Sequence, residues 1–157
     1  MGRLFSHTSR EELPAEQVSK ALDAFRNPSS WPDWNSVAKN MLATKAESID
    51  EGDHLAIFQM IKGSLIETRW LVKTIREGDG FCEIELFGEG QYRNERSIGK
   101  GLKNVQICLT FLSQDGGGIE VHSSCEASLL MAMFAKQINA FMKKQAEQFL
   151  EDLAKIE

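Results

Sequence analysis

The chain has 157 residues, of which 42% are hydrophobic and 26% are charged, and its formal net charge is -5 at pH 7. This length and balance predict one globular domain over residues 1–157, with a hydrophobic core of its own. The net negative charge disfavours a nucleic-acid partner, because phosphate binding needs a concentrated basic surface.

Cysteine usage and hydropathy exclude further classes of protein. The three cysteines, Cys82, Cys108 and Cys125, are an odd number without CxxC spacing, so neither a disulfide framework nor a metal site is predicted. The longest apolar run, Leu129–Ala135, has seven residues, whereas a membrane span needs about 20. No signal peptide is recognised. We therefore expect a cytoplasmic protein with no integral membrane association.

The N-terminal third predicts one strand and a short helix, followed by a compact elbow. Residues 3–9 alternate as a strand does, and Pro14 then opens a helix that carries apolar residues at helical spacing through Phe25. Trp31-Pro32-Asp33-Trp34-Asn35 suits neither a helix interior nor a strand interior, because Pro32 lacks an N–H and restricts the residue before it. We expect this elbow to form a second short helix with large side chains turned inward.

From residue 38 the sequence predicts successive strands joined by short turns rich in Gly and Asp. With the first strand, the predicted strands cover residues 3–9, 38–49, 54–62, 65–76, 81–87, 102–112 and 119–127. Residues 88–101 are expected to form a loop. Because parallel strands need long crossovers, these short connections indicate an antiparallel meander of seven strands.

Alternation within the strands predicts one apolar and one polar face of the sheet. In residues 65–76, Ile66 and Trp70 share a face, while Glu67 and Arg69 point the other way. The strands at 81–87 and 119–127 alternate in the same manner. The apolar face needs a cover, and the C-terminal segment from Leu129 onward contains no Gly or Pro and suits a single long amphipathic helix. Its first half is almost entirely apolar, so we expect that half to be the more deeply buried.

This order of elements resembles the START-like (SRPBCC) superfamily, which has the Bet v 1-like helix-grip fold. The local match is the Leu13-Pro14-Ala15-Glu16-Gln17-Val18 helix start and the Trp31–Asn35 elbow, within a resemblance that covers nearly the whole chain. The polyketide cyclase/dehydrase-like and coenzyme-Q-binding-like groups are the most similar. The resemblance implies an α+β fold, in which a curved seven-stranded antiparallel sheet wraps around a long C-terminal helix, with two short helices after the first strand.

The resemblance also implies a cavity between sheet and helix that binds a hydrophobic small molecule. Carried onto this sequence, the expected ligand-binding residues are Trp34, Phe58, Met60, Trp70, Ile84, Phe134, Ile138 and Phe141. On the strand at 54–62, however, Leu55, Ile57 and Ile61 make the opposite face nearly as apolar as that of Phe58 and Met60. Each of these side chains also suits an ordinary core position.

No catalytic constellation or cofactor motif is recognised. His7, His54 and His122 lack the spacing of metal ligands, and the glycines at 88–101 do not match a phosphate-binding loop. The leading hypothesis is binding or transport of a lipid, quinone or polyketide-like compound without chemistry. One alternative is a cyclase or dehydratase, which needs a general acid or base inside the pocket. The other is a protein-interaction module of the chaperone-activator kind, which needs an exposed apolar patch.

Overall fold

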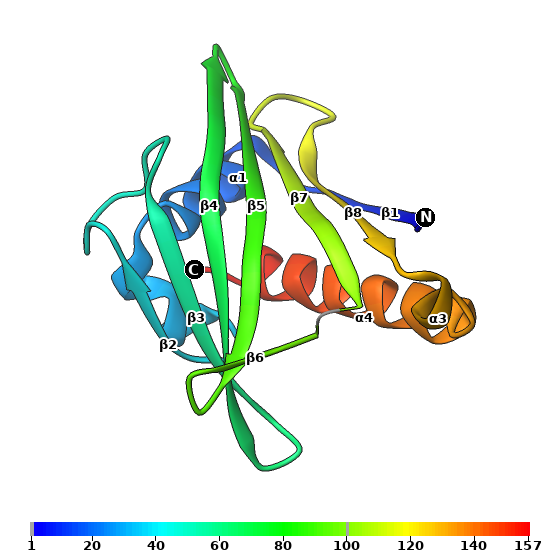
Figure 1. The fold of residues 1–157 in the computed structure, drawn as a ribbon. Coiled ribbons are helices and arrows are strands. Elements are labelled where there is room, and N and C mark those ends of the chain that lie inside the picture. Colours follow the sequence, from blue (N-terminus) through cyan, green and yellow to red (C-terminus); the bar gives the residue numbers. More distant parts are fainter. Residues whose placement is uncertain (1, 100) are drawn as a thin grey trace.

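The computed structural model describes residues 2–99 and 101–157 (Figure 1). Strand β1 (Arg3–Glu12) is followed by helix α1 (Ala15–Phe25), a 3-10 turn η1 (Pro28–Ser30) and the four-residue helix α2 (Trp31–Trp34). The remaining strands are β2 (Ala38–Ala43), β3 (His54–Ile61), β4 (Ser64–Gly78), β5 (Phe81–Arg93), β6 (Arg96–Ile98), β7 (Leu102–Leu112) and β8 (Gly118–Ala127). Helices α3 (Leu129–Ala132) and α4 (Ala135–Ala154) end the described fold.

The strands form one antiparallel sheet in the order β1-β8-β7-β5-β4-β3-β2, and the short β6 pairs with β5 outside this path. Helix α4 crosses behind the strands in Figure 1, and α1 lies on the same side. By its contacts α4 packs against β1, β8 and α1. The α+β helix-grip arrangement predicted from the sequence is therefore confirmed, with two short helices between β1 and β2.

The elbow forms because its polar groups are paired while its aromatic rings are buried. The Trp31 indole N–H donates to the Phe25 carbonyl at 2.9 Å, and Trp34 donates to Ser30 Oγ at 3.1 Å. The buried Asn35 accepts hydrogen bonds at its Oδ1 from the N–H groups of residues 37 and 38, which ends α2 and leads into β2. These bonds let two tryptophans enter the core beside the sheet.

The aromatic cluster, which we define as Phe25, Trp31, Trp34 and Phe149, joins the elbow to the end of α4. The Trp31 and Trp34 ring centroids lie 4.9 Å apart, and those of Phe25 and Trp31 lie 5.2 Å apart. Phe149 is within 6.1 Å of all three other rings. Separations of this size suit favourable tilted and edge-to-face packing, so the cluster fixes α4 against α1 and α2.

The predicted alternation is confirmed in β4, β5 and β8. Ile66, Trp70 and Val72 are buried on β4, as are Cys82 and Ile84 on β5, while the residues between them are more exposed. A bulge between Val72 and Thr74 changes the face of later β4 residues, so that residue 75 lies opposite Ile84.

Three strand ends differ most from the sequence prediction, and the sheet has eight strands instead of seven because β6 forms within the predicted loop. β1 continues to Glu12 instead of residue 9, along its full ladder with β8. β2 ends at Ala43 instead of Ile49, because residues 44–53 form a loop that still buries Ile49 completely. β5 continues to Arg93 through the glycines that predicted a loop, since a bulge lets Gly88 and Gly90 stay within the β4–β5 ladder. Lys100, within the same predicted loop, lies outside the described residues.

Candidate functional site

Helix α4 presents two different faces to the sheet. Its buried face contains Ile138, Ala146, Leu150 and Leu153. Ile138 belongs to a small core cluster with Phe5, Cys125 and Ala127, whereas the later three belong to the main core. This face therefore holds the helix against β1 and β8 at one edge of the sheet and against the main core beyond it.

A neighbouring face of α4 turns toward the opposite edge of the sheet. Phe134, Phe141, Gln148 and Asp152 share it by helical spacing. Asp152 accepts hydrogen bonds from the backbone N–H and hydroxyl of Ser36, at 2.9 and 2.8 Å, and from Gln148 at 3.1 Å. Because Ser36 lies immediately before β2, this contact directs the Phe134–Asp152 face toward the β2 edge.

Phe134 and Phe141 are the half-exposed members of this face, with 49% and 54% of their surface accessible. The helix packs on β1 and β8, so its Phe134 and Phe141 side chains lack the cover that the aromatic cluster gives Phe149. Large, half-exposed apolar side chains on a helix that packs against a sheet form a surface suited to an apolar ligand.

The expectation that the first half of the C-terminal segment is the more deeply buried is wrong. The predicted single helix is divided into α3 and α4 at residues 133–134, and Leu129, Leu130 and Met133 are 69%, 71% and 77% exposed. The second half supplies Leu150 and the fully buried Leu153 instead. The physical reason is that α1 and the aromatic cluster cover the second half, whereas the first half packs through one side on the small cluster formed by β1, β8 and the start of β7.

The eight residues expected to bind ligand are not brought to one site. Trp70 and Ile84 lie in the packed main core, and Trp34 lies against the same core in the aromatic cluster. Ile138 is buried in the smaller cluster, and the half-exposed Phe134 and Phe141 lie on the α4 face beside it.

The prediction that Phe58 and Met60 lie on the inner face of β3 is wrong. The register pairs Phe58 with Glu67 on the outer face of the sheet, and Met60 shares that face by alternation. Leu55, which is buried opposite Trp70, and Ile57 take the inner positions. Both faces of this strand are apolar in sequence, so the pattern alone could not distinguish them.

Ser123 is an inner-face polar residue that the sequence reading did not select. Its hydroxyl is shielded from solvent and has no hydrogen-bond partner within residues 2–99 and 101–157. It shares the inner face of β8 with Cys125, which packs with Ile138 of α4. A shielded hydroxyl without a partner is costly in a purely structural role. The alternation of β8 indicated its direction, but serine on an inner face is too common to mark a site.

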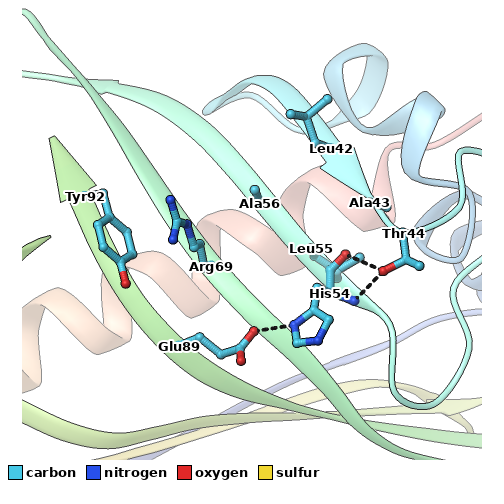
Figure 2. A pocket seen from close by; sticks show the side chains of 9 residues that line it. All are labelled: Leu42, Ala43, Thr44, His54, Leu55, Ala56, Arg69, Glu89 and Tyr92. Atoms are coloured by element: carbon cyan, nitrogen blue, oxygen red, sulfur yellow. Dashed lines mark hydrogen bonds and ion pairs between the residues drawn. The ribbon is translucent and has the colours of Figure 1, made fainter. Parts of the chain in front are cut away.

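The outer face of the sheet carries an open hollow of about 510 Å³ (Figure 2). His54 Nδ1 lies 2.7 Å from a Glu89 carboxylate oxygen, and the Arg69 guanidinium lies over the Tyr92 ring at 3.9 Å from its centroid. Arg69 also donates to Glu67 at 2.6 Å. These groups already pair with one another and are widely exposed, so the hollow is a polar surface depression with an apolar base.

A second hollow, of about 420 Å³, lies beside the elbow. Trp34 and Asn35 contribute to its wall, together with residues on either side of them. Its lining includes more polar surface, among it Asp33 and Lys39. Trp34 therefore borders an open hollow, while its ring packs in the aromatic cluster.

One group of potential metal ligands occurs on the outer face. Side-chain ligand atoms of Glu83, Glu85 and Cys108 lie within 4.8 Å of one another. Arg76 pairs with both carboxylates and supplies their counter-charge. Burial, and then the two neighbouring carboxylates, raise the pKa of Cys108 to about 11, so its thiol stays protonated at neutral pH. The cluster is an ion-pair network with an inert thiol.

The buried ionisable groups also have structural partners. Asp53 accepts from the Asp50 N–H at 2.9 Å and pairs with Lys45, and Asp152 is held by Ser36 and Gln148. His54 and His122 are exposed, the latter 2.6 Å from the Thr8 hydroxyl. These contacts use the carboxylates to fix loops and helices.

No helix within residues 2–99 and 101–157 combines the length and apolar character needed to cross a membrane. No family model matches the chain, and no curated protein matches its sequence.

Comparison with solved structures identifies the fold. The chain is similar to ginseng major latex-like protein 151 from Panax ginseng, with a TM-score of 0.70 at 9% identity over 96% of this chain and 95% of that one. It is similar to a START superfamily protein from Mycobacterium smegmatis, with a TM-score of 0.62 at 10% identity over 96% and 94% of the two chains. Truncated norcoclaurine synthase from Thalictrum flavum gives a TM-score of 0.61 at 8% identity over 99% and 92%. The chain therefore has the helix-grip fold of Bet v 1-like and START proteins.

Proposed function

We propose that this chain binds a hydrophobic small molecule between the inner face of its sheet and helix α4. The carrying observation is the half-exposed pair Phe134 and Phe141, which lies on the α4 face directed toward the β2 edge. The apolar parts of a lipid, quinone or polyketide-like compound would cover these rings. Each Å² of apolar surface so covered stabilises the complex by about 25 cal/mol.

The proposed ligand contacts are Phe134 and Phe141, with Ile138 buried beside them. The Ser123 hydroxyl would give the ligand one polar anchor, since it is shielded and unpartnered among the described residues. A ligand would reach the main core only at the deepest part of the site. There it would contact Trp70, Ile84 and Trp34, which already pack in or against that core. The three free thiols accord with a reducing, cytoplasmic compartment.

Binding is favoured over catalysis by the chemistry of the inner face. The similar solved structures include an enzyme, norcoclaurine synthase, as well as proteins described without an activity. A cyclase or dehydratase needs an acid or base at the reacting atoms. The inner-face residues near α4 include His7, which lies opposite Ser123 in the β1–β8 register and whose Nε2 lies 2.7 Å from the Ser9 hydroxyl. Asp53 and Asp152 are also engaged in structural contacts.

Native mass spectrometry of the freshly purified protein, followed by organic extraction, tests the proposal. We expect a mass above that of the polypeptide and an extract that contains an apolar compound in stoichiometric amount. The Phe134→Ser/Phe141→Ser variant should retain less of that compound, and Leu42→Ser, an exposed outer-face substitution, should retain as much as the unmodified chain. Ligand-free protein together with no stabilisation by any added lipid or quinone would refute the proposal.

A further inference from the structure

Helix α3, the first turn of the C-terminal segment, lies at one end of the molecule (Figure 1). Leu129, Leu130 and Met133 are the most exposed large apolar residues of the described chain. They form a group separate from Phe134 and Phe141, the two residues of the proposed ligand site, which lie at the start of α4 and within it. An apolar group of this kind on a surface indicates an interaction site.

Helix α3 is fixed to the rest of the fold by a capping hydrogen bond and by the packing of Met131. The Ser128 hydroxyl accepts a hydrogen bond from the Met131 N–H at 3.2 Å, which caps α3. Met131 turns inward to the small core cluster, and it packs so closely on Gly101 that a Cβ there would lie 2.2 Å from Met131 Cγ. Leu129, Leu130 and Met133 are therefore presented outward on an anchored support.

The charge of this region is opposite to that of the whole chain. Residues 127–146 contain three lysines, Lys136, Lys143 and Lys144, and no Asp or Glu, although the chain carries a formal net charge of -5. Lys143 makes only a 4.0 Å contact with Glu147, and Lys136 and Lys144 form no ion pair within the described residues. Phe141 and Lys144 are neighbours at i, i+3 on α4. Apolar and cationic side chains thus share this part of the surface.

We propose that the α3 tip, Leu129, Leu130 and Met133, docks on a bilayer surface that contains anionic lipid. Projecting apolar side chains flanked by lysines suit insertion into the headgroup region, with the lysines at the level of the lipid phosphates. The charge complementarity favours an anionic surface, and the projecting shape favours a deformable bilayer over a rigid protein groove. This docking does not depend on the proposed ligand.

Flotation with phosphatidylcholine vesicles, with and without 30% phosphatidylserine, tests the docking surface. We expect the chain to float with the anionic vesicles and to be released as salt is raised. The Lys136→Gln/Lys144→Gln variant should bind these vesicles roughly thirtyfold more weakly, because each lysine contributes about a factor of five. The matched Lys20→Gln/Lys39→Gln variant, with exposed lysines on α1 and β2, should bind as the unmodified chain does.

The Leu130→Ser/Met133→Ser variant tests the apolar part, and its far-UV circular dichroism and Tm should match those of the unmodified chain because both side chains are exposed. Its vesicle binding should fall by about tenfold or more. Equal binding of all variants, or equal flotation without anionic lipid, would overturn the proposal. A dimer in sedimentation velocity that this variant abolishes, without vesicle binding, would assign the tip to a second copy instead. If the unmodified chain binds a hydrophobic ligand but does not bind vesicles, the docking proposal is refuted and the proposed function is not affected.

Discussion

The two halves of the C-terminal segment differ in apolar content and in surroundings, and the more apolar first half is the more exposed. Residues 129–141 expose leucine, methionine and phenylalanine side chains, whereas Leu150 and Leu153 are buried against the main core. The second half meets α1 and the aromatic cluster, and the first half packs on the small cluster of β1, β8 and the start of β7. The two halves therefore differ in role: the C-terminal half holds the fold together, and the N-terminal half is the part that we propose binds ligand.

The largest difference between the halves should appear on removal of Trp31, the centre of the aromatic cluster. This side chain is 2% exposed and contacts Phe25, Trp34 and Phe149. Trp31→Ala should lower the free energy of unfolding by about 3–5 kcal/mol, because it leaves a cavity in a packed core. Urea denaturation measures the loss.

Phe141→Ala is the matched control for this substitution, since it truncates an aromatic side chain in the first half of the C-terminal segment, away from the aromatic cluster. Because Phe141 is half-exposed, the expected change in the free energy of unfolding is below about 1 kcal/mol. Equal losses for the two variants would contradict the division of the helix into a structural and a binding half.

The Asp152–Ser36 contact should have the next largest effect. Asp152→Ala removes the acceptor of two hydrogen bonds from Ser36. Because Ser36 is exposed and its donors can bond to water instead, the expected loss is about 0.5–1.5 kcal/mol. A double-mutant cycle with Ser36→Ala in thermal denaturation measures the coupling. An additive pair would show that this contact does not direct α4 toward the β2 edge.

The inner and outer faces of most strands could be predicted from the sequence. Successive side chains point to opposite faces, so a strand with only one apolar face can be oriented toward the core in only one way. β4, β5 and β8 meet that condition, through Trp70, Ile84 and Val121 for example. β3 does not, because Phe58 on one face and Leu55 on the other are equally apolar, and only pairing with Glu67 and Trp70 decides between them. The wrong positions of Phe58 and Met60 follow from that symmetry.

The unequal burial of the C-terminal segment could not be predicted from its apolar stripe. Periodicity identifies which side chains share a face, but not which end of the helix meets other elements. The decisive contacts come from residues far away in sequence, Trp31 and Ser36. The break between α3 and α4 contains no Gly or Pro, so no local signal marked it.

The smallest expected effect is a difference in alkylation rate between two buried cysteines that belong to different core clusters. Cys82 belongs to the main core and Cys125 to the small cluster beneath Ile138. Burial raises the pKa of both thiols, so alkylation requires local opening and its rate should rise with pH through the alkaline range. In a Cys108→Ser background, iodoacetamide should modify Cys125 roughly tenfold faster than Cys82, since opening of the smaller cluster costs less free energy.

Mass spectrometry of peptides after timed alkylation measures the two rates. Unfolded protein in guanidinium chloride provides the control, because both thiols should then react at the same rate. A faster reaction of Cys82 in the folded state would mean that the main core opens first, which contradicts the comparison.

The central claim is that the half-exposed face of α4 binds apolar ligands, and titration with the fluorescent probe 8-anilinonaphthalene-1-sulfonate tests it most directly. The matched variants are Phe134→Ser/Phe141→Ser and Leu4→Ser/Leu42→Ser, which remove exposed apolar side chains from α4 and from the outer face of the sheet. We expect saturable binding with unchanged Kd for the outer-face variant and a Kd raised about tenfold or more for the α4 variant. Equal Kd values for both variants and the unmodified chain would contradict it.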